Sequence, residues 1–455
     1  MTRRRQRLRG AGGLAIGTAM ALTLSGCAGF GELGQAPGVT TITLASVNNP
    51  QMQDLATLIP KFNAEHPDIR VNLLMMEEND LRNATTQDAA TQGGQYDVMT
   101  VGSYEVPIWG ENGWLMDVTD KMAEDPSYDA DDFFTPIKES ASVDGRTYAA
   151  PFYGESSFLM YRKDLLAEAG VEMPERPTWQ EVADIARQLK TDERAGICLR
   201  AKPGWGEMFA PLTTVVNTFG GQWYDEQWNA HVDDQGFTEA TQFYVDTLAE
   251  SGQRDPVSFG FTECLNLFSQ GNAAMWYDAT SAAGSLESDS SGVKGKVGYV
   301  RAPVMKTENA GWLFSWNLAI SNESDNKDAA WEFVKWATSK EYVELVGNEL
   351  GWAQAPSGTR ASTFEIPEYA EAGGDFAPLT AEIMNEVDPK QPGVAPQNWV
   401  GIQYVTIPQF QDVGNQTSQL IADVIAGRRE LPEALSDGQR IAQRAGEQQK
   451  LEEGK

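Results

Sequence analysis

The chain has 455 residues, in which 35 Lys and Arg stand against 65 Asp and Glu, and its formal net charge is −30. A surface this acidic repels phosphate backbones and anionic lipid headgroups, so the composition argues against nucleic acid as a partner and requires any membrane attachment to come from a covalent lipid. The length is enough for two domains, each with its own hydrophobic core.

The first 26 residues have the features of an export signal. Arginines but no acids occur in the first nine positions, and an apolar run from Ala11, too short for a membrane span, ends in LSGC at Leu24–Cys27. This ending resembles a bacterial lipobox and predicts lipidation of Cys27, whereas an ordinary signal peptide is the alternative. Arg3–Arg5 also fit the twin-arginine export route, which the sequence does not distinguish from general secretion. Residues 27–38 are rich in glycine and typical of a flexible tether.

Two further cysteines, Cys198 and Cys264, follow Cys27 in the chain. An exported protein meets an oxidising compartment, in which such a pair can form a disulfide. Two buried free thiols fit the same sequence, because reduced cysteine behaves as a small apolar residue. Both states therefore remain open at this stage.

From Thr40 the sequence alternates between strand and helix patterns. Asn49 and Pro50 are typical of a helix cap and a first helical residue, and apolar residues follow at helical spacing. The predicted elements are a strand at Thr40–Val47, a helix from Pro50, a strand at Ile69–Met75, a polar helix through Gln92 and a strand at Asp97–Val101. This order predicts a parallel sheet with right-handed crossovers.

Polar residues follow each of these three strands. Ligands of parallel sheets bind outside the carboxyl ends of the strands, so these side chains are expected to converge on a ligand rich in hydroxyl groups. Taken singly, each is also explained as a turn residue or a helix cap. The residues are Asn48 and Asn49 after the first strand, Glu77, Glu78 and Asn79 after the second, and Gly102, Ser103, Tyr104 and Glu105 after the third.

Helices are expected to dominate beyond Pro151. The stretch APFYGESSFLMYRKDLLAEAG, residues 150–170, places Glu155 just ahead of a predicted helix start, and Thr178 and Glu181 form a capping box for a second helix. Later elements are predicted as strands at Val297–Val300 and Trp312–Ile320 and a helix that contains Ala330, Phe333, Val334 and Ala337. This late strand-helix unit is a candidate to complete the first sheet.

Enzyme motifs are missing from the sequence, which has no HExxH, GxSxG or Walker A motif and no Cys/His cluster. The two histidines, His66 and His231, lie where solvated loops are expected, so zinc and Ser-His-Asp chemistry lack the necessary residues. Hydrolysis by two carboxylates stays open, for example in a glycan-active enzyme that uses Glu155 with Asp278. We predict no catalytic residue, no metal and no cofactor.

Tryptophan is abundant, with 13 residues, and several of them lie beside Gly, Asn or acids instead of within apolar runs. Aromatic faces accept the C–H faces of sugars and polyols, while acids, amides and arginine bond the hydroxyls. An indole packed in a core is the alternative for each one. The candidates are Trp205, Trp223, Trp276, Trp312 and Trp316.

Four long segments of the sequence resemble the extracellular solute-binding family 1 proteins of bacterial ABC importers. They are YDVMTVGSYEVPIWGENGWLMDVTD, DGRTYAAPFYGESSFLMYRKDLLAEAG, PTWQEVADIARQL and GWLFSWNLAISNESDNKDAAWEFVKWATS, and the resemblance extends from about Thr40 to beyond Arg360. Shorter strings, among them VNNPQM, EENDLR, APFYGESS, GICLRAKPGWGE and AQAPSGTR, are most similar to the sorbitol/mannitol (polyol) binding branch.

The resemblance implies a fold of the α/β class with two periplasmic-binding-protein-like lobes, each a mainly parallel sheet flanked by helices. It places 39–150 and 303–354 in the N-terminal lobe and 151–302 and 355–455 in the C-terminal lobe. The ligand is expected in the cleft between the lobes. The implied ligand-binding residues are Asn48, Glu78, Tyr104, Tyr153, Glu155, Trp205, Asp278, Trp316 and Arg360, with Tyr153 stacking on the ligand and Glu155 accepting hydrogen bonds from its hydroxyls.

The implied function is that of a substrate-binding component of an ABC importer, anchored by a lipid on the extracellular face of the cell membrane. It would be a monomer that captures a sugar alcohol by hinge closure and delivers it to the permease subunits. A monosaccharide or disaccharide is the alternative ligand within this class. The rivals from other classes are the glycan-active enzyme and an adhesin built on the same fold.

Overall fold

The computed structural model describes residues 38–308 and 310–454. The predicted signal sequence, the lipidation site at Cys27 and all of the tether except residue 38 lie outside the described residues. Within the described part, no helix combines the length and apolar character that a membrane span requires.

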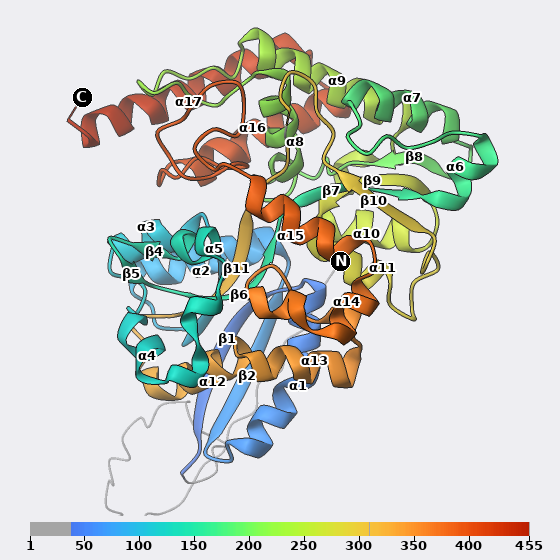
Figure 1. The fold of residues 1–455 in the computed structure, drawn as a ribbon. Helices are drawn as coiled ribbons and strands as arrows, with labels where there is room; N and C mark the ends of the chain where they lie inside the picture. The colour runs from blue at the N-terminus through green and yellow to red at the C-terminus, as the bar shows by residue number, and fades with distance from the viewer. Residues whose placement is uncertain (1–37, 309, 455) are drawn as a thin grey trace, which may run out of the picture. The chain divides into compact units, whose positions relative to one another are not determined.

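The described chain forms a five-stranded sheet, a four-stranded sheet and a two-stranded sheet, with helices around them (Figure 1). The strands are β1 (Thr40–Val47), β2 (Ile69–Met76), β3 (Val98–Gly102), β4 (Ser142–Val143), β5 (Arg146–Thr147), β6 (Ala150–Glu155), β7 (Ser157–Arg162), β8 (Ala195–Cys198), β9 (Ala273–Ala279), β10 (Val297–Arg301) and β11 (Phe314–Ile320). The helices are α1 (Pro50–Glu65), α2 (Glu78–Thr91), α3 (Glu105–Glu111), α4 (Thr119–Glu124), α5 (Thr135–Ser140), α6 (Lys163–Ala169), α7 (Trp179–Leu189), α8 (Phe209–Phe219), α9 (Gln235–Ser251), α10 (Phe261–Ser269), α11 (Ala283–Leu286), α12 (Lys327–Ala337), α13 (Lys340–Leu350), α14 (Pro367–Gly373), α15 (Phe376–Glu386), α16 (Phe410–Ile425) and α17 (Leu431–Glu452).

The elements with strong local signals confirm the predictions. Strand β1 begins and ends where predicted, and Pro50 is the first residue of α1, whose apolar side chains at helical spacing are buried. In the capping box of α7, the Thr178 hydroxyl accepts a hydrogen bond from the backbone N–H of Glu181, and the Glu181 carboxylate accepts one from the backbone N–H of Thr178. Local pattern was sufficient here because the stabilising contacts lie within a few residues of one another.

The prediction for residues 150–162 was wrong. Two strands, β6 and β7, occupy this stretch, and the helix begins only at Lys163. Every residue of β6 is buried, so this strand has no polar face and no alternation that would identify it. The same reason accounts for β9, another fully buried strand that the sequence analysis did not predict.

The expectation of mainly parallel sheets needs a correction, because both sheets are mixed. In the first sheet, of order β2-β1-β3-β11-β6, the strand β11 is antiparallel to both of its neighbours. In the second sheet, of order β10-β7-β9-β8, the strand β7 is antiparallel to both of its neighbours. In the chain, β7 directly follows β6 of the first sheet, and β11 directly follows β10 of the second sheet. Because each of these two strands is reached from the other sheet, it runs in the direction opposite to that of its neighbours.

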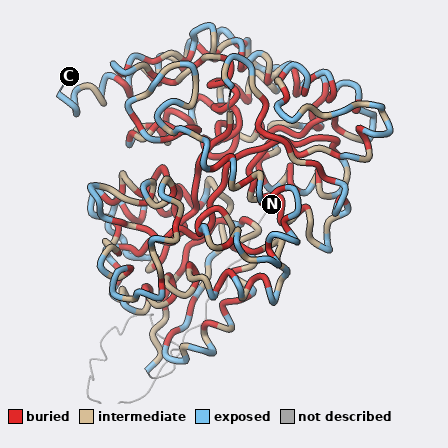
Figure 2. The backbone as a smooth tube through the Cα atoms, viewed as in Figure 1, coloured by how far each residue is buried: buried red, intermediate tan, exposed pale blue. Residues whose placement is uncertain are grey.

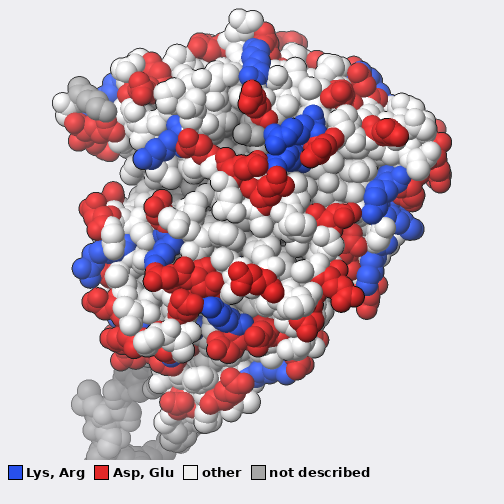
Figure 3. Space-filling view, viewed as in Figure 1, with Lys and Arg blue, Asp and Glu red and all other residues white. Residues whose placement is uncertain are grey.

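Two lobes are defined by these sheets: the first lobe is built on the five-stranded sheet and the second lobe on the four-stranded sheet. The first passage between them lies at Ser156, since β6 pairs with β11 and β7 pairs with β9; the sequence analysis had assigned β6 to the C-terminal lobe. Helix α12 packs on the first lobe, whereas α15 packs against β10 and α17 against α9 in the second lobe. Buried backbone follows the strands of both sheets (Figure 2), and acidic side chains are spread over the face shown in Figure 3.

Candidate functional site

A cavity lies between the two lobes, at the ends of their strands. The first lobe lines it with Asn49, Glu78, Arg82, Glu155, Phe314 and Trp316, and the second lobe with Arg200, Trp205, Gly206, Ala210, Phe261, Ser281 and Gln403. Its free volume is about 30 Å³, which is room for one or two water molecules. A ligand of the size of a sugar therefore enters only if the two lobes move apart.

Arg82 occupies the first-lobe side of the cavity. Its Nε donates to Oε1 of Glu78 at 3.0 Å, and its Nη1 pairs with the buried carboxylate of Glu105. The guanidinium also lies close to two indole rings, 4.2 Å from the centroid of Trp205 and 4.7 Å from that of Trp316. Because Trp205 belongs to the second lobe and the other partners to the first, Arg82 links the two sides of the cavity.

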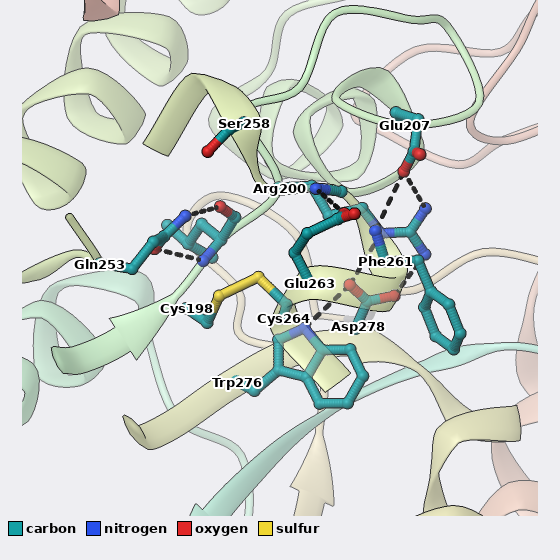
Figure 4. The surroundings of a disulfide bond; sticks show 12 residues. Cys198, Arg200, Glu207, Gln253, Ser258, Phe261, Glu263, Cys264, Trp276 and Asp278 are labelled. Carbon is teal, nitrogen blue, oxygen red and sulfur yellow. Dashed lines mark hydrogen bonds and ion pairs between the residues drawn. A yellow bond between two sulfur atoms is a disulfide. The ribbon is translucent and has the colours of Figure 1, made fainter. Parts of the chain in front are cut away.

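Arg200 occupies the second-lobe side and is paired with Asp278 (Figure 4). Its Nε and Nη2 donate to the two carboxylate oxygens at 2.8 and 2.5 Å, a bidentate arrangement. The same carboxylate accepts hydrogen bonds from Nε1 of Trp276 at 2.9 Å and from the backbone N–H of Ala279 at 2.7 Å. Asp278 is thus fully used in orienting Arg200.

Glu155, the last residue of β6, lines the cavity from the first lobe and is 7% exposed. Its carboxylate accepts a hydrogen bond from Oγ of Ser281, in the second lobe, at 2.6 Å. Burial raises the pKa of Glu155 to about 7, from an ordinary value of 4.5. The carboxyl group therefore changes its charge near neutral pH, which a solvated glutamate does not do.

A disulfide bond between Cys198 and Cys264 joins β8 to α10. Figure 4 shows it beside the Arg200–Asp278 pair. Cys198 lies close in sequence to Arg200, and Cys264 lies close to Phe261, whose ring is 5.1 Å from the Arg200 guanidinium. The cross-link, which the sequence left open, therefore braces the two segments that carry these cavity residues.

The structure brings together four of the predicted ligand residues, Glu78, Glu155, Trp205 and Trp316, which all line the cavity. Tyr104, Tyr153 and Asp278 are buried and support lining residues from behind. The Tyr153 hydroxyl accepts from Nδ2 of Asn49 at 2.8 Å, and the ring of Tyr104 packs against Trp205 with centroids 4.8 Å apart.

Two predicted residues lie away from the cavity. The side chain of Asn48 is exposed and accepts a hydrogen bond from Nε2 of Gln53 at 3.0 Å, while its neighbour Asn49 faces the cavity. Arg360 is 1% exposed, lies 4.2 Å from the centroid of Phe133 and donates to the backbone oxygen of Thr338 at 2.9 Å. The three further tryptophan candidates, Trp223, Trp276 and Trp312, are buried and are not among the lining residues.

Several lining residues were missed by the sequence analysis. Arg82 had a usable signal, because it lies four residues after Glu78 on a predicted helix and so shares its face. Arg200 and Gln403 had none, since each lies in an irregular segment that only the tertiary fold brings to the cavity. Over residues 38–308 and 310–454, no group of His, Cys, Asp and Glu has an arrangement that would hold a metal ion.

The paired charges determine what the cavity can bind. Both arginines are neutralised by carboxylates of the protein itself, so no unpaired cation is presented to an acidic ligand. The aromatic rings and polar groups instead match a neutral molecule that has both C–H faces and hydroxyls.

Comparisons with known proteins agree with this chemistry. Residues 47–344 match the family model described as bacterial extracellular solute-binding protein. The chain is 42% identical over 414 residues to the mannitol-binding protein of Pseudomonas aeruginosa, a match covering 90% of this chain and 94% of that protein. Its structure is similar to that of a solute-binding protein from Agrobacterium vitis S4 with bound D-mannitol, with a TM-score of 0.87, 44% identity and coverage of 90% of this chain and 98% of that one. A relative from Agrobacterium radiobacter K84 in complex with ribitol has a TM-score of 0.80 and 26% identity, with coverage of 90% and 98%.

Proposed function

Because the chain belongs to the bacterial extracellular solute-binding protein family, we propose that it is the polyol-binding component of an ABC importer, with D-mannitol as the first candidate ligand. The observation that carries the proposal is the cavity between the lobes, whose two arginines are each paired with carboxylates and whose walls include two indole rings. The D-mannitol bound to a 44% identical relative supports the choice of ligand.

Binding proceeds by movement of the two lobes about the passages that connect them. The cavity of about 30 Å³ is too small for a hexitol, so the ligand enters when the lobes are apart and is enclosed when they approach. Ligand contacts with both lobes favour the closed arrangement, because only that arrangement completes the site. The closed form is the one delivered to the permease subunits.

The cellular setting is the second part of the proposal. Lipidation of Cys27, supported by the LSGC sequence, holds the protein on the extracellular face of the cell membrane as a monomer. The anchoring is assigned to the lipid because the acidic surface does not attract anionic headgroups.

The alternatives differ in ligand or in class. A monosaccharide or disaccharide could occupy the same kind of site, and the ligand panel below separates these. A glycan-active enzyme with Glu155 and Asp278 is disfavoured, because Asp278 is fully engaged by Arg200, Trp276 and a backbone N–H. An adhesin would leave the cavity without a small-molecule ligand.

Thermal melting in the presence of polyols, monosaccharides and disaccharides tests the proposal. For the protein from residue 28 onward, D-mannitol at 100 times its dissociation constant is expected to stabilise the fold by about 2.7 kcal/mol. The Glu155→Ala variant is expected to lose most of this shift, since Glu155 lines the cavity.

The matched control is Glu368→Ala, which removes an exposed acid that does not line the cavity and should leave the shift unchanged. A shift with a disaccharide but with no polyol would replace the ligand while preserving the transport function. No shift with any carbohydrate would contradict the proposal, and release of product from a glycoside would support the enzyme.

A further inference from the structure

An irregular segment, residues 387–409, connects α15 to α16 and reaches the cavity from the C-terminal part of the chain (Figure 1). Long irregular segments inside a compact fold are commonly functional or loosely held. This one is held from both lobes. Asn217 of the second lobe donates from Nδ2 to the Ile402 carbonyl at 3.3 Å, and Tyr104 of the first lobe donates from its hydroxyl to the Ile407 carbonyl at 3.0 Å.

An aromatic contact fixes the middle of this segment. The ring of Tyr404 packs among three others, with centroids 5.7 Å from Tyr104, 5.9 Å from Trp205 and 6.1 Å from Phe314. Gln403 lies between this ring and the bonded carbonyl of Ile402, so its backbone is held on both sides. A side chain on such a backbone is pre-organised for binding.

The side chain of Gln403, a cavity-lining residue, has an unused hydrogen-bonding atom. The residue is 2% exposed and lines the cavity, yet its Oε1 has no hydrogen-bond partner among the described residues. A buried acceptor without a partner destabilises the protein unless something else bonds to it. Nε1 of Trp205, another lining residue, likewise lacks an acceptor within the described chain.

Apart from Gln403 and Trp205, the polar side chains that line the cavity already have partners within the protein. Glu155 accepts from Ser281, and Asn49 donates to Tyr153. Both arginines are held by carboxylates, as described above. The unpaired Oε1 of Gln403 is therefore available to accept a hydrogen bond from a hydroxyl of the ligand. Removing this acceptor would lower the affinity only for ligands that carry that hydroxyl.

We propose that Gln403 is a specificity-determining residue that accepts a hydrogen bond from one ligand hydroxyl through Oε1. The inference rests on the proposed polyol-binding function and adds a ligand contact from the segment 387–409. Its consequence is selective: Gln403 discriminates between polyols that present a hydroxyl at this point and those that do not.

Calorimetric titration of the wild type, Gln403→Met and Gln391→Met tests the proposal. Methionine keeps the approximate length of glutamine but cannot accept this hydrogen bond, and Gln391 is an exposed glutamine in the same segment that does not line the cavity. The ligands are D-mannitol and derivatives in which one symmetry-related pair of hydroxyls is replaced by hydrogen. Replacing both members of a pair prevents the ligand from recovering the contact by reversing its orientation.

The expected result is that Gln403→Met binds D-mannitol about tenfold more weakly than the wild type, while Gln391→Met binds it normally. For the derivative that lacks the partner hydroxyl, the wild type and Gln403→Met should have equal affinity.

An equal loss of affinity for every ligand, or no loss for any ligand, overturns the inference. If Gln403→Met does not fold, Gln403→Asn, which withdraws the amide by one methylene, is titrated against the same ligands and must show the same selectivity. A wild type that binds no polyol overturns the proposed function as well, so the two failures are distinguishable.

Discussion

Glu155 shows how a single residue takes its properties from the fold. In sequence it is a lone acid between two aromatics and two serines, equally consistent with a helix start, a catalytic acid or a binding acid. In the structure it ends a buried strand, faces a cavity and is bonded to Ser281 across the two lobes. Burial raises its pKa to about 7, so its ionised form is destabilised relative to a solvated carboxylate.

This pKa predicts a pH-dependent stability difference between the ligand-free wild type and Glu155→Gln. The folded pKa of about 7 exceeds the ordinary value of 4.5, so the folded state holds the proton more tightly than the unfolded state. The contribution of Glu155 to stability is therefore complete below pH 4.5 and is lost as the pH rises through 7. Glu155→Gln, which never ionises, should match the wild type at low pH and exceed it above neutrality by at most about 3 kcal/mol.

Urea unfolding of both proteins between about pH 5 and pH 8 measures this difference. Glu207, whose pKa burial also raises to about 7, is present in both proteins and so cancels in the comparison. A difference that stays constant across this pH range would show that Glu155 is not the titrating group.

At the scale of elements, the start of α2 in the first lobe and the segment Lys202–Gly206 in the second lobe are in contact near the cavity. Nζ of Lys202 lies 2.5 Å from Oε1 of Glu77, and Nδ2 of Asn79 donates to the Pro203 carbonyl at 3.2 Å. A β-carbon on Gly206 would collide with the carboxylate of Glu78, so a larger residue at this position would displace the Glu78 side chain. These contacts exist only when the lobes are together, and they stabilise the closed arrangement without needing to touch the ligand.

Replacing Lys202 should therefore weaken ligand binding although the residue does not line the cavity. Lys202→Met removes the ion pair with Glu77, together with a second ion pair, at 3.3 Å, with Glu207 in its own lobe. The partly exposed pair between the lobes contributes about 0.5 to 1 kcal/mol, which corresponds to roughly a two- to fivefold loss of affinity. The control is Lys294→Met, which removes an ion pair with Asp289 that lies entirely within the second lobe. In a double-mutant cycle, Glu77→Gln should add little to Lys202→Met. Additive losses would show that the two residues do not act as a pair.

At the scale of the whole molecule, direct passages between the sheets determine where the site lies. Strands β6 and β7 are separated only by Ser156, and each lies in a different sheet. Within the second lobe the disulfide adds a second constraint, because it joins residues 66 positions apart next to the Arg200–Asp278 pair. The connection between the lobes and the bracing within the second lobe thus have separate structural origins.

Removing the disulfide should lower the free energy of unfolding while the fold is retained. The Cys198→Ala/Cys264→Ala variant should unfold with a free energy about 2 to 4 kcal/mol lower than that of the wild type, because the unfolded chain loses the closure of a long loop. Denaturant unfolding of the ligand-free proteins measures this loss. Equal stabilities would indicate that the disulfide does not constrain the unfolded state.

The sequence by itself determined the elements and interactions that are local. Strand β1, the start of α1 at Pro50, the capping box of α7 and the acid Glu78 at a strand end were all predictable, since each depends on residues only a few positions apart. The resemblance of long segments supplied the family and the two-lobe fold, which the comparisons confirm.

Only the tertiary structure decided which distant residues meet. It paired Arg200 with Asp278, joined Cys198 to Cys264, and brought Gln403 from the C-terminal part of the chain to the cavity. It also placed Asn49 instead of Asn48 at the site and reversed β7 and β11 within their sheets. The physical reason is that ion pairs, disulfides and buried hydrogen bonds between distant residues depend on the path of the whole chain, whereas periodicity and capping report only the contacts that each segment makes with itself.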